Sequence, residues 1–400
     1  MLQHIFKLMW NKKREHALLI TEIAVGFLVV FALSVTIVGS WRLYHTPLGF
    51  DYEEAWSVNI QIGGNWDEEN ITRIRQVVQA ARELPEVEWA HVMWGPPFVR
   101  YQWSSSVVGE EGRSMSSMFN YTNDGGLADI GVELIDGRWF GPEDEGLDHD
   151  VVVISKRFQE ELFPDSSPLG ENVRDFSDYE DGDERREMRV VGVFEDFRQL
   201  GEFSPLLPYA FTRFSLAGEE EDGINILAVK VRPGTTAEFE EALLERLRGV
   251  AKSWDFDATT WVELREASIR EYLLPITIMA IIGGFLMLMV AFGLFGVLWQ
   301  NVTRRTQEVG LRRAMGATQA SIQLQIIGEL LIVSLLGIGI GLIIAVQFPM
   351  LDAAVMFSWS NSIYGGIAAI LVILGMSALC AWYPSRVATR FSPATALHYE

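Results

Sequence analysis

Cysteine is nearly absent from this chain: Cys380 is the only one among 400 residues, so no disulfide can form within the chain. This shortage is neutral about the cellular compartment, because an exported domain of sufficient size buries enough surface to fold without disulfides. Histidine is also scarce. The three in the central part, His45, His91 and His149, have no second His, Cys or carboxylate at recognisable metal-ligand spacing. The sequence therefore predicts no disulfide and no metal site.

Motifs for nucleotide chemistry and for hydrolysis are missing too. A P-loop needs a Gly-Lys pair, because its backbone N–H groups hold the phosphates while the lysine reaches the terminal one. No Gly-Lys pair and no G-x-S-x-G motif occur in the sequence, and the many carboxylates are scattered. We predict no catalytic residue and no cofactor. If ATP is used, a separate subunit binds it.

Positive charge is sparse in the middle of the chain. Residues 41 to 272 carry 22 Lys and Arg against 47 Asp and Glu, a net charge of −25, whereas the remainder carries 10 against 6, or +4. An acidic domain of this kind is a poor partner for nucleic acid or for anionic lipid. Nucleic-acid binding is therefore excluded.

Long hydrophobic runs are present in number. Each of the four meets the roughly 20 apolar residues that a helix needs to span a bilayer, and they cover residues 17–40, 273–299, 321–348 and 363–383. The sequence predicts a membrane α-helical protein with four transmembrane helices. A large extracytoplasmic α/β domain, residues 45–270, is inserted between the first and second helices, and residues 349–362 form a short external loop.

Clusters of basic residues set the expected topology. Positive charge near a membrane span resists translocation, so the basic loops stay in the cytoplasm. The clusters are Lys7 with Lys12, Lys13 and Arg14; Arg304, Arg305, Arg312 and Arg313; and Arg386 with Arg390. We therefore expect a multi-pass protein of the inner (cytoplasmic) membrane. Residues 1–16 form an amphipathic segment on membrane lipid, residues 300–318 are a cytoplasmic segment, and residues 384–400 are a cytoplasmic tail.

The insert shows two strand-helix-strand units, residues 52–104 and 225–264, on either side of a lobe at residues 112–205. In the first unit, an alternating strand over 55–62 precedes a helix over 68–84, where apolar residues recur at helical spacing. In the second, strands over 226–231 and 258–264 flank a helix over 236–254. This order predicts a split α/β sandwich with an inserted lobe. The charge run over 178–187 is typical of a solvated loop.

The basic segment over 301–317 reads as a helix that stops at Gly316, a usual helix stop. We expect Val309, Leu311 and Met315 to lie toward one side of this helix, with the arginines and Glu308 spread over the rest. Composition alone leaves two interpretations open. The segment is either a topological anchor whose arginines meet lipid phosphates, or a helix that docks on a partner.

The run Glu308-Val-Gly-Leu-Arg-Arg-Ala-Met-Gly-Ala317 resembles the E-I-G-[LI]-R-[RK]-A-[LM]-G-A signature of the FtsX/MacB-type permeases of ABC transporters. The resemblance implies that this segment couples the permease to an ATP-binding subunit. The implied partner-binding residues are Arg304, Arg305, Glu308, Val309, Gly310, Leu311, Arg312, Arg313, Met315 and Gly316.

Two further stretches extend the resemblance. The end of the chain, over 383–397, is similar to the family's proline-terminated last span followed by P-x-x-A-L, which gives an FtsX-like permease domain over 275–397. The lobe contains Ile135-Asp-Gly-Arg-Trp-Phe140, Val151-Val-Val-Ile-Ser155 and Val190-Val-Gly-Val-Phe194, which look like steps of the MacB-type periplasmic core. Unlike MacB itself, the chain has no fused N-terminal nucleotide-binding domain.

The resemblance implies a permease that couples ATP hydrolysis by a separate ABC subunit to movements of its periplasmic domain, in efflux or export of a drug, peptide or other periplasmic cargo. It also implies a homodimer or a heterodimer with a sister permease, and a periplasmic adaptor. Two alternatives remain: a lipoprotein-release or cell-division complex of the same architecture, and a non-transport membrane sensor, which should carry a signalling module after the last span.

Two acids lie inside the apolar runs, Glu22 and Glu329. An intramembrane acid is by default a functional candidate. For Glu22 the alternatives are an acid near the helix end that reaches the interface or pairs with a lysine, and an interhelical contact. For Glu329 the alternative to function is an interfacial or interhelical hydrogen bond.

Overall fold

The computed structural model describes residues 13–62, 68–100, 103–109, 112–175, 187–214, 225–236, 238–304, 306–351 and 357–390. These residues divide into two compact units, one of residues 1–42 with 273–400 and one of residues 43–272. Arg305, most of the amphipathic segment, almost all of the charge run over 178–187 and the last residues of the closing motif lie outside the described residues.

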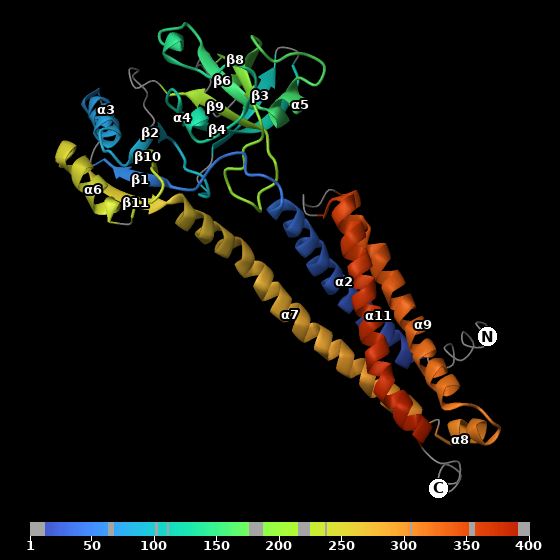
Figure 1. The fold of residues 1–400 in the computed structure, drawn as a ribbon. Coiled ribbons are helices and arrows are strands. Elements are labelled where there is room, and N and C mark those ends of the chain that lie inside the picture. Colours follow the sequence, from blue (N-terminus) through green and yellow to red (C-terminus); the bar gives the residue numbers. More distant parts are fainter. Residues whose placement is uncertain are drawn as a thin grey trace. The chain divides into compact units, whose positions relative to one another are not determined.

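The first unit consists of helices (Figure 1). Four of them are long and apolar enough to cross a membrane, over Ala17–Tyr44, Trp261–Arg304, Gln319–Met350 and Trp359–Val387. The expected class is therefore confirmed: four long apolar helices, with an α/β domain between the first and second. The helices are α2 (Lys13–Tyr44), α7 (Trp261–Arg304), α8 (Thr306–Ala314), α9 (Gln319–Ala345), α10 (Gln347–Met350) and α11 (Trp359–Arg390).

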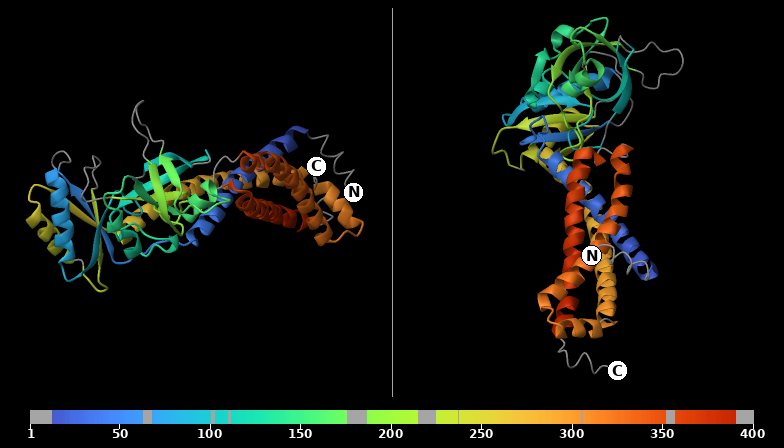
Figure 2. Two further views of the ribbon diagram at one scale, coloured as in Figure 1. Left: turned by 90° about the horizontal axis from the view of Figure 1, so that it is seen from above. Right: turned by 90° about the vertical axis from the view of Figure 1, so that its right-hand side faces the viewer.

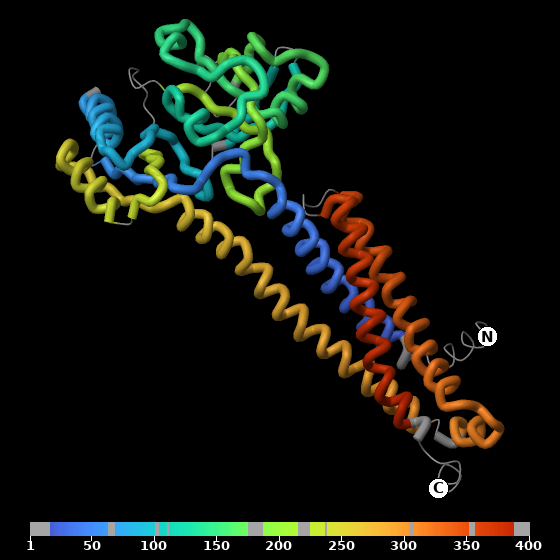
Figure 3. The backbone as a smooth tube through the Cα atoms, in the orientation of Figure 1, coloured from blue at the N-terminus to red at the C-terminus, as the bar shows by residue number. Residues whose placement is uncertain are grey.

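Helices α2, α7 and α11 extend beyond the predicted spans at both ends. Figure 3 traces α7 as one uninterrupted helix, with Pro275 inside it. The sequence predicts that the last span ends at its proline, and helix α11 itself continues through Pro384 to Arg390. The Ser385 hydroxyl donates to the carbonyl of Trp382 at 2.9 Å. Serine hydroxyls of this kind help to satisfy the backbone groups that a proline frees inside a helix.

Small residues let the long helices approach closely. A Cβ added at Gly337 of α9 would lie 2.7 Å from Ile23 of α2, and one at Gly341 would lie 2.5 Å from Phe27. In α11, a Cβ at Gly365 would come 2.7 Å from the backbone nitrogen of Val35. Helix α9 also runs beside α11, as both views in Figure 2 show. The glycines are thus the surfaces on which α2 packs.

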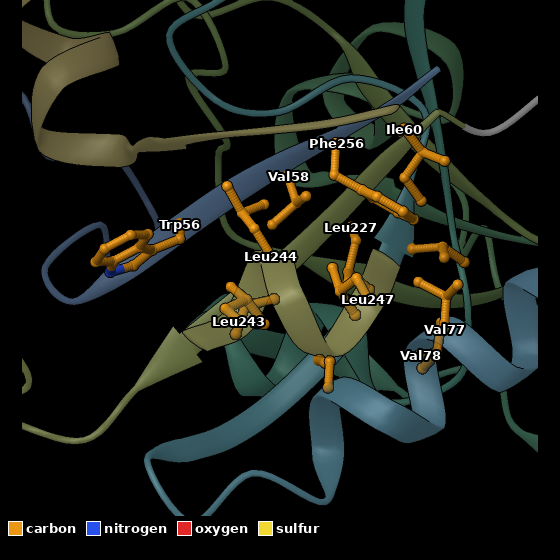
Figure 4. Close-up of a cluster of buried hydrophobic side chains, with 14 of the residues drawn as sticks. Trp56, Val58, Ile60, Val77, Val78, Leu227, Leu243, Leu244, Leu247 and Phe256 are labelled. Atoms are coloured by element: carbon orange, nitrogen blue, oxygen red, sulfur yellow. The ribbon is translucent and has the colours of Figure 1, made fainter. Parts of the chain in front are cut away.

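The second unit holds one 11-stranded sheet, in which β2 also pairs with a strand of the lobe. One part of this sheet is antiparallel, with four strands in the order β11-β1-β10-β2. Its strands are β1 (Ala55–Gln61), β2 (Val87–Met93), β10 (Ile226–Val231) and β11 (Asp255–Thr260). Helices α3 (Glu68–Arg82) and α6 (Phe239–Val250) pack against one face, and their apolar residues meet those of the strands in one core (Figure 4). Because β10 lies between β1 and β2, the two strand-helix-strand units interleave, as in a split β-α-β arrangement.

The lobe between these units is a closed ring of six strands. Strands β4 and β9 pair in parallel and complete the order β4-β3-β7-β8-β6-β9, while β5 pairs with β8. The strands are β3 (Trp103–Gly109), β4 (Ser114–Thr122), β5 (Leu134–Gly137), β6 (Asp150–Ser155), β7 (Asn172–Asp175), β8 (Glu187–Phe194) and β9 (Tyr209–Arg213). Short helices α4 (Gly126–Asp129), α5 (Lys156–Leu162) and η1 (Pro142–Asp144) lie in the connections.

The last predicted strand, over 258–264, is partly wrong. Strand β11 ends at Thr260, and residues from Trp261 onward are the start of α7. The backbone N–H of Glu263 donates to the Thr260 hydroxyl at 3.1 Å, and the backbone N–H of Thr260 donates to the Glu263 carboxylate at 3.2 Å. This reciprocal capping box begins the helix. The Thr-x-x-Glu spacing is visible in the sequence and could have placed this boundary.

Candidate functional site

The basic segment after α7 folds into the short helix α8, Thr306–Ala314. Gly316 has φ +98°, its N–H donates to the carbonyl of Arg313, and the N–H of Ala317 donates to the carbonyl of Arg312, both at 3.0 Å. These two bonds form a Schellman stop, which needs a residue that tolerates the left-handed conformation. The helix thus ends at the glycine that the sequence indicated.

The apolar side chains of α8 point in two directions. Val309 is half-buried, whereas Leu311 is 53% exposed and Met315 is 73% exposed. The expectation that all three lie toward one side is wrong, because residues two apart on a helix face nearly opposite sides, while residues four apart share a face. Leu311 and Met315 together form the exposed apolar face of α8. Gly310, which directly precedes Leu311, is buried.

The inward side of α8 borders a cavity of about 90 Å³. Val309 lines it together with apolar residues of α2, α7 and α9, among them Leu19, Leu298 and Ile322. Polar residues also line it, namely Asn301, Glu308, Arg312, Gln325 and Glu329. The cavity therefore lies between the short helix and three membrane helices, α2, α7 and α9.

A chain of hydrogen bonds runs along this cavity, which we call the α8–α9 relay: Glu308, Arg312, Gln325 and Glu329. The Glu308 carboxylate lies 2.5 Å from Arg312 Nη2, and Arg312 Nη1 donates to Gln325 Oε1 at 2.8 Å. Gln325 Nε2 in turn donates to Glu329 Oε1 at 3.1 Å. An arginine that pairs with a carboxylate and an amide oxygen at once joins two helices firmly, because its guanidinium is a rigid fork of donors.

Arg312 and Glu329 belong to the same chain of hydrogen bonds, although they are 17 positions apart in the sequence. Glu329 accepts a hydrogen bond within α9 itself, from Gln325 one turn earlier. Glu22 lies against another helix. A Cβ at Gly293 of α7 would come within 2.3 Å of Glu22 Oε1, so the glycine makes room for this carboxylate. For Glu22 the structure has the interhelical arrangement.

Arg304 ends α7, and Arg313 is half-buried on α8. Helix α8 also contacts α11. Thr318 begins α9 by accepting a hydrogen bond from the backbone N–H of Ser321 at 3.2 Å. The loop between α8 and α9 is thus short and has defined ends on both sides, which gives α8 a definite orientation on α9.

In the insert, one buried histidine has polar partners that the sequence did not indicate. His91 Nε2 lies 2.6 Å from Asp129 Oδ2, and Arg82 Nη2 lies 3.4 Å from His91 Nδ1. Burial lowers the pKa of His91, the hydrogen bond to Asp129 opposes this, and the charge of Arg82 adds to it. A neutral ring that donates to Asp129 and accepts from Arg82 satisfies both nitrogens. This cluster ties α3 and α4 to β2, and its members were too far apart in sequence to be recognised.

Among the described residues, no group of three or more His, Cys, Asp or Glu side chains could hold a metal ion.

Two sequence families match the chain. Residues 17–246 match the MacB-like periplasmic core domain, and residues 270–393 match the FtsX-like permease C-terminal domain. The macrolide export ATP-binding/permease protein MacB of Neisseria gonorrhoeae is 27% identical over 280 residues, which are 67% of this chain and 41% of that protein. MacB of Hahella chejuensis is 23% identical over 412 residues, covering 99% of this chain and 60% of that protein.

Among solved structures, the periplasmic region of MacB from Actinobacillus actinomycetemcomitans matches 56% of this chain and 97% of its own, with 16% identity and a TM-score of 0.38. The chain spans about two fifths of the length of the first curated relatives. The first family match alone covers more than half of the chain. The chain therefore belongs to the MacB/FtsX family of ABC transporter permeases, as a multi-pass membrane protein whose MacB-like domain is periplasmic.

Proposed function

We propose that this chain is a permease subunit that couples ATP hydrolysis by a separate ATP-binding subunit to movements of its periplasmic domain. The proposed task is efflux or export of a drug, peptide or other periplasmic cargo. The implied partners are the ATP-binding subunit, a second permease as homodimer or heterodimer, and a periplasmic adaptor. In the proposed mechanism, cargo on the outer side is moved by the domain, without passage through the bilayer.

The two sides of α8 differ in their surroundings, and this difference supports the proposal. Its exposed face carries Leu311 and Met315, two large apolar side chains that a partner can cover. Its opposite side is fastened to α9 through Arg312 and Gln325. A segment that serves only as a topological anchor needs positive charge, but it needs neither an exposed apolar face nor a defined attachment to the next span.

The α8–α9 relay is a path along which a displacement of α8 can reach α9. In the proposal, a partner that closes on the exposed face pushes α8, and Arg312 passes the displacement to Gln325 and Glu329 within α9. The residues proposed to contact the partner are Leu311, Met315, Arg304 and Arg313, with Arg305 added from the sequence. Glu308, Val309, Gly310, Arg312 and Gly316 are proposed to set the position and length of the helix.

The test compares three changes in α8. Leu311→Asp places a charge in the proposed apolar contact, where an unpaired buried charge costs several kcal/mol, roughly 3 to 5. Gly310→Pro breaks the helix at a cost of about 3 kcal/mol without a change of charge. Arg304→Gln with Arg305→Gln removes about 1 kcal/mol per charge of attraction to anionic lipid. We expect the first two variants to insert normally and to lose co-purification with the ATP-binding subunit, or to lose the ATPase activity that the permease stimulates.

Ala320→Asp is the matched control, because it adds the same charge at an exposed position in the first turn of α9. It should retain partner binding. A purely topological role predicts the opposite ranking, with the double arginine variant as the most damaging. If Leu311→Asp and Gly310→Pro both keep full partner binding and stimulated ATPase activity, the coupling role of α8 is wrong.

A further inference from the structure

The loop between β8 and β9 contains a fully buried arginine. Arg198 is 1% exposed, and each of its guanidinium N–H groups meets a backbone carbonyl. Its Nη1 donates to Leu43 O at 2.9 Å and to Thr46 O at 2.8 Å. Nε and Nη2 both donate to Ser204 O, at 3.1 and 2.6 Å, and Nη2 also donates to Glu202 O.

These acceptors explain what the buried charge does. Burying a guanidinium is costly unless hydrogen bonds replace its hydration. Here the replacement comes from carbonyls of two segments about 150 residues apart. Leu43 belongs to the last turn of α2, and Thr46 closes the turn that follows it, with its own N–H donating to the carbonyl of Leu43 at 3.1 Å. Arg198 therefore holds the end of α2 against the loop over 198–204, which we call the clamp.

The clamp also contacts the start of α7. The buried carboxylate of Glu202 pairs with Arg265 of α7, and the Ser268 hydroxyl donates to the carbonyl of Leu200 at 3.2 Å. The ring of Phe203 is stacked on that of Tyr272, with centroids 4.2 Å apart and an interplanar angle of 1°. Residues 265, 268 and 272 are three and four positions apart, so they share one face of the helix.

A third attachment joins the clamp to the body of the domain. Gln199 Nε2 donates to the carbonyls of Gly95 and Pro96, both at 3.3 Å, and its amide oxygen accepts from the hydroxyl of Tyr209 at the start of β9. The carbonyl of Gln199 also accepts from the N–H of Phe98 at 2.6 Å. Consecutive residues of one loop thus bind the end of α2, the start of α7 and the lobe.

We propose that the clamp makes the end of α2 and the start of α7 move as one body with the lobe, and that Arg198 is its positioning residue. Helices α2 and α7 are the two chain connections into the periplasmic domain, so the clamp is where a displacement of either helix would reach the lobe. This transmission role rests on the proposed function. The attachment itself stands on the contacts described above.

The experiment uses the full chain with its ATP-binding subunit in lipid nanodiscs. Amide hydrogen exchange is followed in peptides that cover residues 43–48 and 198–204. The variant is Arg265→Gln, which removes the α7 partner of Glu202 and leaves Arg198 in place. The matched control is Arg270→Gln on the same helix, where an exposed arginine lies 3.5 Å from Glu266. Rates are measured without nucleotide and with the ATPase trapped by vanadate.

Without nucleotide, we expect Arg265→Gln to accelerate exchange in the clamp about tenfold, because an ion pair with a buried carboxylate is lost, whereas Arg270→Gln leaves it unchanged. With vanadate, wild type and Arg270→Gln should show a changed exchange rate in the clamp, and Arg265→Gln should lose that change while it keeps ATP hydrolysis. A role in local packing alone would not remove the nucleotide response.

Exchange in Arg265→Gln equal to that of wild type would overturn the attachment of the clamp to α7. A preserved nucleotide response in this variant would overturn its role in transmission. If wild type itself shows no nucleotide response in the domain, the proposed coupling function fails instead, and the comparison without nucleotide still decides whether the clamp holds α7.

Discussion

The two units of this chain build their interiors by opposite means. The periplasmic domain fills its core with large side chains, such as Trp261, Tyr209 and Phe211, and it also buries a fully hydrogen-bonded arginine, Arg198. In the helical unit, glycines allow close packing: α2 lies directly against Gly337, Gly341 and Gly365.

The solvent explains the difference. In water, burial of a large apolar side chain is favourable in itself, so the domain gains stability from volume. Lipid tails are as apolar as leucine, so helices in a bilayer gain from close packing of backbones and from a few hydrogen bonds. We therefore expect the domain to be sensitive to removed volume and the helical unit to added volume.

The largest effect should come from Trp261→Ala in the domain. The indole is fully buried and its Nε1 donates to the Ser57 hydroxyl at 2.7 Å. Truncation leaves a cavity and an unpaired hydroxyl, and we expect a loss of about 3 to 5 kcal/mol in the free energy of unfolding. Chemical denaturation measures it. Val262→Ala at the neighbouring exposed position is the control, and an equal loss there would contradict the cavity explanation.

The helical unit should respond to the opposite change. Gly341→Leu adds volume where a Cβ would already lie 2.5 Å from the Phe27 ring, whereas Gly339→Leu, two positions away in α9, adds it in open space. We expect overpacking to cost about 1 to 3 kcal/mol at Gly341. Thermal stability in detergent measures this. Similar melting of the two variants would show that α9 does not use this glycine to pack on α2.

A difference in acid sensitivity should follow from His91. Burial lowers its pKa in the folded domain, so the unfolded state binds a proton first as the pH falls. The stability that the neutral histidine contributes is present above its unfolded pKa, about 6.5, and is lost below it, at no more than about 1.4 kcal/mol per pH unit for one proton. Unfolding followed from pH 7.5 to 5 should show this slope.

The variant His91→Asn should flatten that part of the profile. If the profile of His91→Asn retains the full slope, another group is responsible and the neutral state of the buried ring is not what the domain depends on.

The smallest effect is expected for a buried hydrogen bond in the helical unit. The hydroxyl of Ser334 in α9 lies 2.8 Å from that of Ser377 in α11, and both residues are fully buried. Interhelical hydrogen bonds of this kind contribute about 0.6 kcal/mol on average. Ser334→Ala should lower thermal stability in detergent only slightly, and a loss as large as that of Gly341→Leu would mean that polar contacts hold the bundle after all.

Much of the architecture could be predicted from local patterns. Four apolar runs gave the four long helices, and alternation over 55–62 with helical spacing over 68–84 indicated β1 and α3. The family resemblance of the segment over 308–317 agreed with the family matches. Errors arose where a local signal was overlooked, as with the capping box of Thr260 and Glu263, or where the angular position was misjudged, as with Val309.

The sequence by itself determined which segments enter lipid, where the acidic domain is inserted and which family the coupling segment resembles, because hydropathy, charge and short motifs act over neighbouring residues. The closure of the lobe by β4 and β9, the relay from Arg312 to Glu329 and the clamp around Arg198 were decided only by the tertiary structure. Each depends on partners brought together from distant positions, and no local spacing specifies which carbonyl or strand a given side chain or edge will meet. Burial then favours these hydrogen bonds strongly, because a polar group that is buried without a partner is costly.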